Sequence, residues 1–244
     1  MSAVGLIPAR HAASRFPGKP LATIAGKPMI QRVYEGAREA KQLRDVIVVT
    51  DDERIARTCS DFGAPCVMTS PDHPTGTDRL AEAAVGLSDE IVVNVQGDEP
   101  LMAGFVIDAA VEALLAERDA VMSTVVHEAD PEGIDDPNRV KAVLDRRGRA
   151  LWFSRATIPA VRDPAARPTW WQHVGLYAYR RAFLMEFVKL PQTPAERAEG
   201  LEQLRALEHG YPIQAAVVRG FRSIPVDVPD DVAKVEAALR ETER

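Results

Sequence analysis

Short apolar runs alternate with segments of helical periodicity in the first half of the chain, and this order constrains the fold more than any other feature. Residues 4–7, 46–49 and 91–95 are nearly continuous apolar runs, as expected for parallel strands that are covered on both faces. Apolar residues recur at helical spacing in residues 28–37, 53–62 and 106–115. Strand and helix in alternation predict an α/β fold with a doubly wound, mostly parallel, Rossmann-like sheet.

The pattern changes after about residue 120, where the segments become shorter and more aromatic. They predict a smaller, mixed α+β part, with strands at 120–126, 139–144, 150–153, 174–179 and 213–218. Helices are expected at 181–188, 196–207 and 231–239, and a loop is expected at 163–169, which is rich in Pro and Ala. Because no linker or internal repeat divides the chain, residues 1–244 are expected to form a single domain.

Composition and charge exclude several classes of function. The net charge is -6, whereas proteins that hold a nucleic-acid backbone usually present a basic surface, so no nucleic-acid partner is expected. No segment approaches the roughly 18 apolar residues of a membrane span, and residues 1–8 lack the apolar region of a signal peptide. We therefore expect no membrane association and a cytoplasmic location. Cys59 and Cys66 are too few for a disulfide framework.

A loop from Arg10 to Lys19 follows the first predicted strand and carries three cations, Arg10, Arg15 and Lys19. In doubly wound sheets this loop is a common place for phosphate contacts. Arginine can grip a phosphate with two hydrogen bonds, lysine supplies a compact charge, and Gly18 allows close approach of backbone N–H groups. On charge alone, a solvated basic loop is the somewhat more common interpretation. The loop matches neither the Walker A motif nor the dinucleotide-binding glycine pattern.

The loop resembles the signature R-x3-S-x-R-x-P-G-K-x-L of sugar nucleotidyltransferases, matched here by Arg10, Ser14, Arg15, Pro17, Gly18, Lys19 and Leu21. Further motifs follow in order along nearly the whole chain: Gly-Lys-Pro-Met-Ile at 26–30, Thr-Asp-Asp at 50–52, Val-Gln-Gly-Asp-Glu-Pro at 95–100, Ser-Arg-Ala-Thr-Ile-Pro at 154–159, His-Val-Gly-Leu-Tyr at 173–177, Leu-Glu-Gln-Leu-Arg at 201–205 and Val-Asp-Val-Pro-Asp-Asp at 226–231. Together they resemble the 3-deoxy-manno-octulosonate cytidylyltransferases, also called CMP-Kdo synthetases.

The resemblance implies an enzyme that transfers CMP from CTP to the anomeric hydroxyl of 3-deoxy-D-manno-octulosonate (Kdo), releasing pyrophosphate, for lipopolysaccharide synthesis. It implies Mg²⁺ as cofactor and a homodimer built from strands of the second half. Residues 1–125 are then expected to be mainly nucleotide-binding, and residues 126–225 mainly sugar-binding and dimer-forming. Such transfers depend on positioning and on charge neutralisation more than on covalent catalysis by the protein.

The same resemblance assigns chemistry to individual positions. Arg10, Lys19, Asp98 and Asp227 are expected to be catalytic, with Asp98 and Asp227 as Mg²⁺ ligands. Each Asp follows a short apolar stretch, and two carboxylates at one sheet edge suit Mg²⁺, although a lone Asp there is more often a turn or capping residue. The expected nucleotide-binding residues are Pro8, Ala9, Arg10, Arg15, Lys19, Gly76, Arg79 and Gln96, with Gly76 and Arg79 close to cytosine. The expected sugar-binding residues are Gln96, Arg155, His173, Tyr177, Glu202 and Gln203.

Three alternatives stay open at this point. Residues 221–225 depart from the family pattern and the loop at 163–169 is short, so a modified Kdo with an amino group, such as the 8-amino sugar, is one possible substrate. Another CMP-sugar synthetase, acting on a sialic acid, should lack the motifs at 154–159 and 201–205. A nucleotide-binding protein without catalysis should lack a metal carboxylate or a loop cation, whereas Arg10, Lys19, Asp98 and Asp227 are all present.

Overall fold

The computed structural model describes residues 1–12, 15–163 and 165–242, so Ser14 of the loop signature lies outside the described residues. The chain forms two compact units: unit 1 comprises Met1–Asp108 and Arg222–Arg244, and unit 2 comprises Ala109–Phe221. Helix α4 (Gly104–Ala116) begins in the first unit and ends in the second. The two units are described in turn below.

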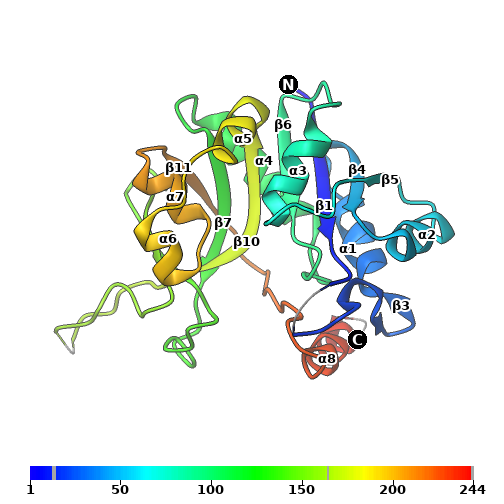
Figure 1. Cartoon of the computed structure of the whole chain (residues 1–244). Helices are drawn as coiled ribbons and strands as arrows, with labels where there is room; N and C mark the ends of the chain where they lie inside the picture. Colours follow the sequence, from blue (N-terminus) through cyan, green and yellow to red (C-terminus); the bar gives the residue numbers. More distant parts are fainter. Residues whose placement is uncertain (13–14, 164, 243–244) are drawn as a thin grey trace. The chain divides into compact units, whose positions relative to one another are not determined.

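Unit 1 is built on a parallel sheet. Its strands are β1 (Ala3–Ala9), β4 (Leu43–Thr50), β5 (Cys66–Met68) and β6 (Ile91–Val95), and they lie in the order β6-β1-β4-β5 (Figure 1). Each neighbouring pair is parallel. Strand β6 is buried along its whole length, which explains why all of its residues except Asn94 are apolar. The predicted strands at 4–7, 46–49 and 91–95 are confirmed.

Unit 1 also contains helices. They are α1 (Met29–Arg38), α2 (Glu53–Asp61), α3 (Gly76–Ala84), the first part of α4, and α8 (Asp231–Thr242). Between β1 and α1 lie the 3₁₀ turn η1 (Lys19–Leu21) and the antiparallel pair β2 (Thr23–Ile24) and β3 (Lys27–Pro28). Pro28 was expected in the first helical turn. It instead precedes α1 in an extended conformation, with ψ of 143°.

The returning C-terminal segment of unit 1 is held by its own apolar cluster. Val226 and Val235 are fully buried against Ile24 and Met29. Burying an aliphatic side chain of this size contributes about 1.5–3 kcal/mol relative to exposure. The cluster therefore fixes residue 227 in space, although it is far along the chain from the loop at residues 10–19.

Unit 2 contains a mixed sheet, as predicted (Figure 1). Its strands are β7 (Met122–Glu128), β8 (Lys141–Leu144), β9 (Ala150–Ser154), β10 (Trp171–Arg180) and β11 (Ile213–Val217). Strand β7 pairs antiparallel with β10 and parallel with β11, while β8 pairs antiparallel with both β10 and β9. The five predicted strands of this half are confirmed, with ends shifted by a few residues.

The helices of unit 2 are the last part of α4, α5 (Arg181–Phe187), α6 (Pro194–Glu199) and α7 (Gln203–Glu208). The single helix expected at 196–207 is wrong, because Gly200 adopts a left-handed conformation with φ of 60° and ends α6. The break places Glu202 and Gln203 at the start of a separate helix.

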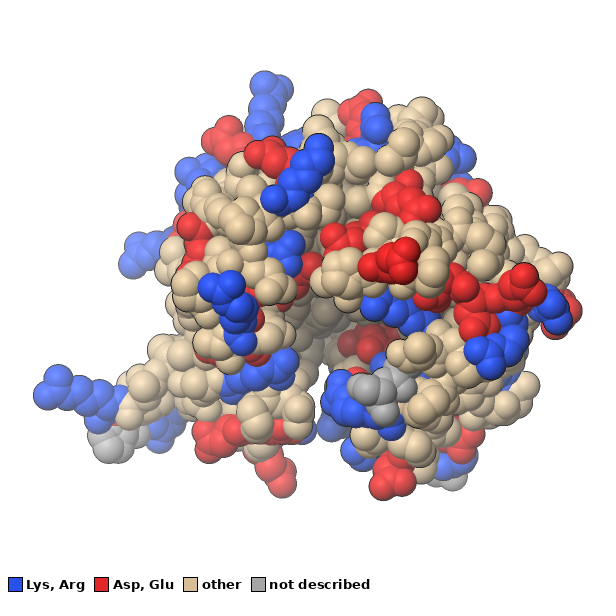
Figure 2. Space-filling model, in the orientation of Figure 1, with Lys and Arg blue, Asp and Glu red and all other residues tan. Residues whose placement is uncertain are grey.

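No helix in the described part of the chain is long and apolar enough to cross a membrane. On the face seen in Figure 2, Lys and Arg side chains are interspersed with Asp and Glu side chains. The charge of the chain is therefore not gathered into one basic area on this face.

Candidate functional site

The loop after β1 turns back at Gly18 to form the base of a charged cluster. Gly18 has φ of 75°, a conformation that favours glycine, and its N–H donates to the carbonyl of His11 at 2.9 Å. The turn leads directly into η1, whose first residue is Lys19. The local sequence thus places Lys19 at a fixed point beside the end of β6, as the next contacts show.

Lys19 joins two carboxylates that are distant in sequence. Its Nζ donates to Asp98 Oδ2 at 2.9 Å and to the carbonyl of Val226 at 2.8 Å, and it lies 3.7 Å from Asp227 Oδ1. Arg15 donates to the same Asp227 oxygen at 2.9 Å. The N–H of Val226 donates to the carbonyl of Asp98 at 2.9 Å, so the backbone itself ties the two carboxylates together.

A second hydrogen bond joins the chain segments that carry Asp98 and Asp227. Glu99 is buried, and its Oε1 accepts a hydrogen bond from Ser223 Oγ at 2.5 Å. Burial raises the pKa of Glu99 to about 8, and the charges of Asp98 and Asp227 act in the same direction. Gly97 is required here for space, because a Cβ at this position would lie 2.7 Å from the carbonyl oxygen of Pro8.

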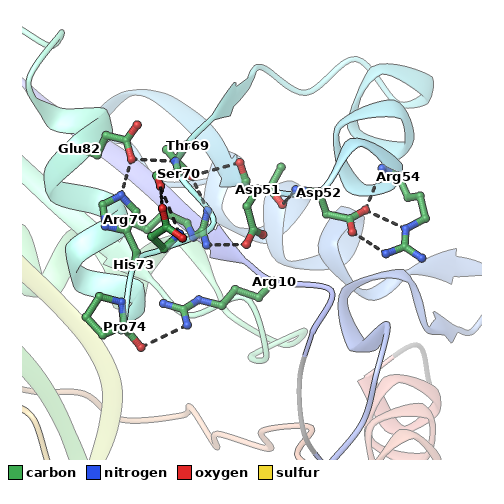
Figure 3. A network of polar contacts seen from close by, with 12 residues as sticks. Arg10, Asp51, Asp52, Arg54, Thr69, Ser70, His73, Pro74, Arg79 and Glu82 are labelled. Atoms are coloured by element: carbon green, nitrogen blue, oxygen red, sulfur yellow. Dashed lines mark hydrogen bonds and ion pairs between the residues drawn. The ribbon is translucent and has the colours of Figure 1, made fainter.

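Arg10 offers an unused donor. Its NH1 donates to the carbonyl of Pro74 at 3.2 Å (Figure 3), whereas its NH2 is buried and has no partner among the described residues. Burial lowers the pKa of Arg10, the charge of Arg79 lowers it further, and Asp51 opposes both effects. Buried polar groups are normally hydrogen-bonded, so this N–H is a natural position for an oxygen of an anionic ligand.

Arg79 is held behind Arg10 by a buried network (Figure 3). Its side chain is fully buried, its NH1 donates to Thr69 Oγ1 at 2.5 Å, and its NH2 lies 3.0 Å from Asp51 Oδ2. It lies in the first turns of α3, which Thr75 caps by accepting from the N–H of Asp78. A direct contact of Arg79 with a base stays a prediction, since the observed partners of its guanidinium are Thr69 and Asp51.

The residues beside Lys19 fit a hard divalent cation. Asp98 and Asp227 present oxygen donors, their side chains are 31% and 39% exposed, and Lys19 Nζ already brings positive charge between them. No point in the described ranges gathers three or more His, Cys, Asp or Glu side chains. Mg²⁺ takes only one or two carboxylates from a protein and completes its octahedron with phosphate oxygens and water.

In unit 2, Arg155 is clamped at two of its donors. Its Nε donates to the carbonyl of Glu199 at 2.6 Å, and its NH1 donates to the carbonyl of Pro137 at 3.0 Å. The Glu199 carboxylate accepts from Ser154 Oγ at 2.6 Å and from the N–H of Arg155 at 2.8 Å. Lys141 is fully buried and donates to the carbonyl of Arg155 at 2.6 Å. Arg155 is therefore a pre-positioned cation rather than a free surface side chain.

His173 and Tyr177 lie next to each other on β10. Their ring centroids are 5.4 Å apart, and Phe153 meets the His173 ring edge-on at 5.1 Å. His173 Nε2 lies 2.9 Å from Thr124 Oγ1. Burial lowers the pKa of His173 to about 3, so its imidazole is neutral near pH 7. Burial also raises the pKa of Tyr177, with Glu202 acting in the same direction.

Glu202 and Gln203 stand at the start of α7, which a buried ion pair fixes to α6. Arg205 donates to Glu196 through Nε at 2.9 Å and through NH2 at 2.5 Å, and it lies 3.5 Å from Glu202. Gln203 is buried, and its Nε2 has no hydrogen-bond partner in the described part of the chain. The predicted sugar-binding residues of unit 2 thus comprise one cation, Arg155, one carboxylate, Glu202, and neutral hydrogen-bonding groups.

Comparison with known proteins decides the family. A family model described as cytidylyltransferase matches residues 4–216. The 3-deoxy-manno-octulosonate cytidylyltransferase of Syntrophotalea carbinolica is 51% identical over 250 residues, covering 98% of this chain and 99% of the relative. The mitochondrial protein of the same name from Arabidopsis thaliana is 46% identical over 242 residues, covering 98% of this chain and 83% of the relative. This chain belongs to the 3-deoxy-manno-octulosonate cytidylyltransferases.

Solved structures agree with this membership. A CMP:2-keto-3-deoxy-manno-octonic acid synthetase complexed with CTP superposes with a TM-score of 0.93 at 39% identity, covering 99% of this chain and 100% of that one. A 4-diphosphocytidyl-2C-methyl-D-erythritol synthase from Anaerococcus prevotii shares only 12% identity, with a TM-score of 0.65. That second likeness concerns the fold alone. The α/β nucleotidyltransferase fold predicted from the sequence is confirmed.

The structure of this family member brings some predicted residues together. Arg15, Lys19, Asp98 and Asp227 form one cluster in unit 1, and His173 contacts Tyr177 in unit 2. Pro8 and Ala9 end β1, and Gln96 follows β6. Gly76 opens α3 close to Pro8, since a Cβ at this position would lie 3.5 Å from the Pro8 side chain. Sequence reasoning gave no role to Asp51, Glu99, Thr124 or Glu199. Asp51 and Glu99 lie inside quoted motifs, which is a signal, whereas Thr124 and Glu199 lie outside them.

Proposed function

We propose that this chain transfers CMP from CTP to the anomeric hydroxyl of Kdo and releases pyrophosphate. The proposal is supported by membership of the 3-deoxy-manno-octulosonate cytidylyltransferases. The observation that carries it most directly is the cluster of Lys19, Asp98 and Asp227 at the end of β6. The cluster lies where parallel α/β sheets bind their ligands, beyond the carboxyl ends of the strands.

In unit 1, the residues around this cluster are suited to a triphosphate. The buried NH2 of Arg10 lacks an acceptor, and a phosphate oxygen would supply one. Lys19 and Arg15 add positive charge that opposes the negative charge developing as pyrophosphate leaves. These residues need not form covalent bonds to the substrate. Holding the α-phosphorus in line with the attacking hydroxyl accounts for much of the rate enhancement.

Asp98 and Asp227 would hold Mg²⁺. When bound, the ion neutralises phosphate charge and polarises the reacting phosphoryl group. The chain's own contribution is to keep the two carboxylates adjacent, through the Val226 N–H bond to the Asp98 carbonyl and through the Glu99–Ser223 hydrogen bond. Lys19 is the third member of the arrangement and keeps the cluster from carrying two uncompensated negative charges.

In unit 2, the residues suit an acidic sugar. Kdo carries a carboxylate, which Arg155 can bind. Two donors of Arg155 hold its guanidinium in place on backbone carbonyls, and its other donors can serve the ligand. The sugar hydroxyls need neutral donors and acceptors, which His173, Tyr177 and Gln203 can supply. Glu202 adds an acceptor for a hydroxyl proton.

Substitution of the carboxylates tests this function. Asp98→Asn and Asp227→Asn should each lower turnover about a hundredfold or more, because a metal ion stabilises transition-state charge by several kcal/mol. Asp230→Asn changes an exposed neighbour and serves as the matched control, with turnover expected near wild type. Pyrophosphate release from CTP, Mg²⁺ and Kdo is the readout. Wild-type turnover in both Asp98→Asn and Asp227→Asn would overturn the metal assignment.

We also propose that the active form is a homodimer that uses strands of unit 2. Strand β9 pairs with β8 alone in the described sheet, and it carries Leu151 and Trp152, which are 57% and 36% exposed. An unpaired edge with large apolar side chains is a common place for association. Sedimentation of the wild-type chain should give a dimer, and Leu151→Glu should give a monomer. A monomeric wild type at micromolar concentration would refute the proposal.

A further inference from the structure

The pairing of β7 with β10 contains an irregularity beside the predicted sugar-binding residues. Val174 is opposite Val125 and Tyr177 is opposite Thr124, so two residues of β10, Gly175 and Leu176, have no counterpart on β7. Bulges of this kind bend a strand and re-aim its side chains, and they are common next to active sites. The irregularity lies between His173 and Tyr177, the two rings that the proposed function assigns to the sugar.

Thr124 closes this bulge with its side chain. It is fully buried, and its Oγ1 lies 2.8 Å from the carbonyl oxygen of Leu176, 3.3 Å from that of Val174 and 2.9 Å from Nε2 of His173. One hydroxyl therefore contacts the backbone on both sides of Gly175 and the ring that precedes it. The carbonyl of Leu176 belongs to the peptide bond that leads into Tyr177.

Proton counting decides how these contacts work. A threonine hydroxyl has a single proton to donate, and a backbone carbonyl can only accept. The short contact with Leu176 therefore requires the Thr124 proton, so the hydroxyl must accept from His173. The proton on the His173 ring then resides on Nε2. If Nε2 were bare, it would take the Thr124 proton and leave two oxygen atoms facing each other at 2.8 Å without a hydrogen.

The neutral ring is then left with Nδ1 as a bare acceptor. Within the described residues, the His173 ring makes no other hydrogen bond, and the residue is only partly buried. The Phe153 ring meets it edge-on at 5.1 Å and Tyr177 lies 5.4 Å away, so the ring plane is held on two sides. A bare, oriented imidazole nitrogen is a hydrogen-bond acceptor for an alcohol O–H.

We propose that Thr124 is a positioning residue for the sugar substrate: its hydroxyl holds the β10 bulge and fixes His173 as the Nε2–H tautomer, which presents Nδ1 to a sugar hydroxyl. This inference rests on the proposed function for the identity of the ligand. The tautomer itself does not depend on turnover.

The test combines nitrogen NMR of histidine-labelled, full-length enzyme with kinetics. Wild type should show a protonated Nε2 and a bare Nδ1 at His173. Thr124→Val keeps the shape but removes the hydroxyl, so it should raise the KM for Kdo about tenfold, corresponding to one lost hydrogen bond, and leave the KM for CTP unchanged. It should also abolish the single tautomer. Thr124→Ser retains the hydroxyl and should behave as wild type.

Ser123→Ala is the matched control. It removes a buried hydroxyl from the preceding residue, whose Oγ donates to the carbonyl of Ala110 and not to β10. Both the tautomer and the KM for Kdo should stay at wild-type values in this variant.

A wild-type His173 with its proton on Nδ1 would overturn the proposal, as would Thr124→Val with wild-type tautomer and wild-type KM for Kdo. If Thr124→Val does not fold, the wild-type tautomer decides, together with the KM of Thr124→Ser. Absence of turnover with every sugar would count against the proposed function and not against the tautomer.

Discussion

Replacing Asp51 by Asn leaves the Arg79 guanidinium buried without its counter-charge. Arg79 is fully buried, Asp51 Oδ2 lies 3.0 Å from its NH2, and the remaining side-chain partner is the neutral hydroxyl of Thr69. Asp51 also offsets the repulsion between Arg79 and Arg10, which together with burial lowers the pKa of Arg10. The substitution therefore removes one charge that serves two arginines.

The expected loss of stability follows from this geometry. Two unit charges 3.0 Å apart attract by about 5.5 kcal/mol at an effective dielectric constant of about 20. Removing one partner of a buried pair typically costs about 3–5 kcal/mol. Because the Asp51 side chain is 19% exposed, water compensates in part, and we expect Asp51→Asn to lower the free energy of unfolding by about 3 kcal/mol.

Urea unfolding at neutral pH measures this loss. The double variant Asp51→Asn/Arg79→Met removes the uncompensated charge as well, so it should be at least about 1 kcal/mol more stable than Asp51→Asn alone. Asp52→Asn is the matched control, because Asp52 pairs with the exposed Arg54 and caps α2, contributions worth about 1 kcal/mol. A loss below about 1 kcal/mol in Asp51→Asn, or a double variant less stable than the single one, would refute the reasoning.

Three further predictions concern stability. The pKa of His173 is lowered to about 3 in the fold, below the unfolded value of about 6.5. Its contribution to stability is therefore complete above about pH 6.5 and is lost progressively at lower pH. Between about pH 7.5 and 5.5, wild type should lose about 1.4 kcal/mol more than His173→Gln in urea unfolding, and equal losses would contradict this. Gly97→Ala should destabilise the fold by at least about 1 kcal/mol in thermal unfolding, since the new Cβ would lie 2.7 Å from the Pro8 carbonyl oxygen. Glu196→Gln removes the nearer of the two carboxylates beside the buried Arg205, the other being Glu202. It should lower the free energy of unfolding by about 3 kcal/mol, a result that an unchanged urea midpoint would exclude.

Much of the fold could be predicted because burial leaves a direct trace in the sequence. The run at residues 91–95 is buried at every position in β6, and a strand covered on both faces tolerates few polar residues. Strand β5 was missed because it is short and mostly exposed at Val67 and Met68, which are 40% and 49% exposed. The division of 196–207 into two helices depends on one left-handed glycine, Gly200, whose φ the sequence suggests but does not determine.

The candidate site was predictable only where chemistry and motif coincide. Lys19 and Asp98 lie in recognisable segments, and the structure joins them at 2.9 Å. Thr124 carries no such signal, because its role arises from strand register, which appears only once β7 and β10 are paired. Glu199 was overlooked for a similar reason: its carboxylate and its carbonyl hold Arg155 only because α6 ends at that residue.

Product formation from CTP tests the central claim most directly. The purified chain is mixed with CTP, Mg²⁺ and, in separate reactions, Kdo, 8-amino-Kdo and a sialic acid, and both pyrophosphate and the CMP-sugar are quantified. The account predicts equimolar pyrophosphate and CMP-Kdo, with Kdo giving the highest kcat/KM. A higher kcat/KM for 8-amino-Kdo or a sialic acid would contradict the Kdo assignment, and no product from any sugar would contradict the proposed catalytic activity.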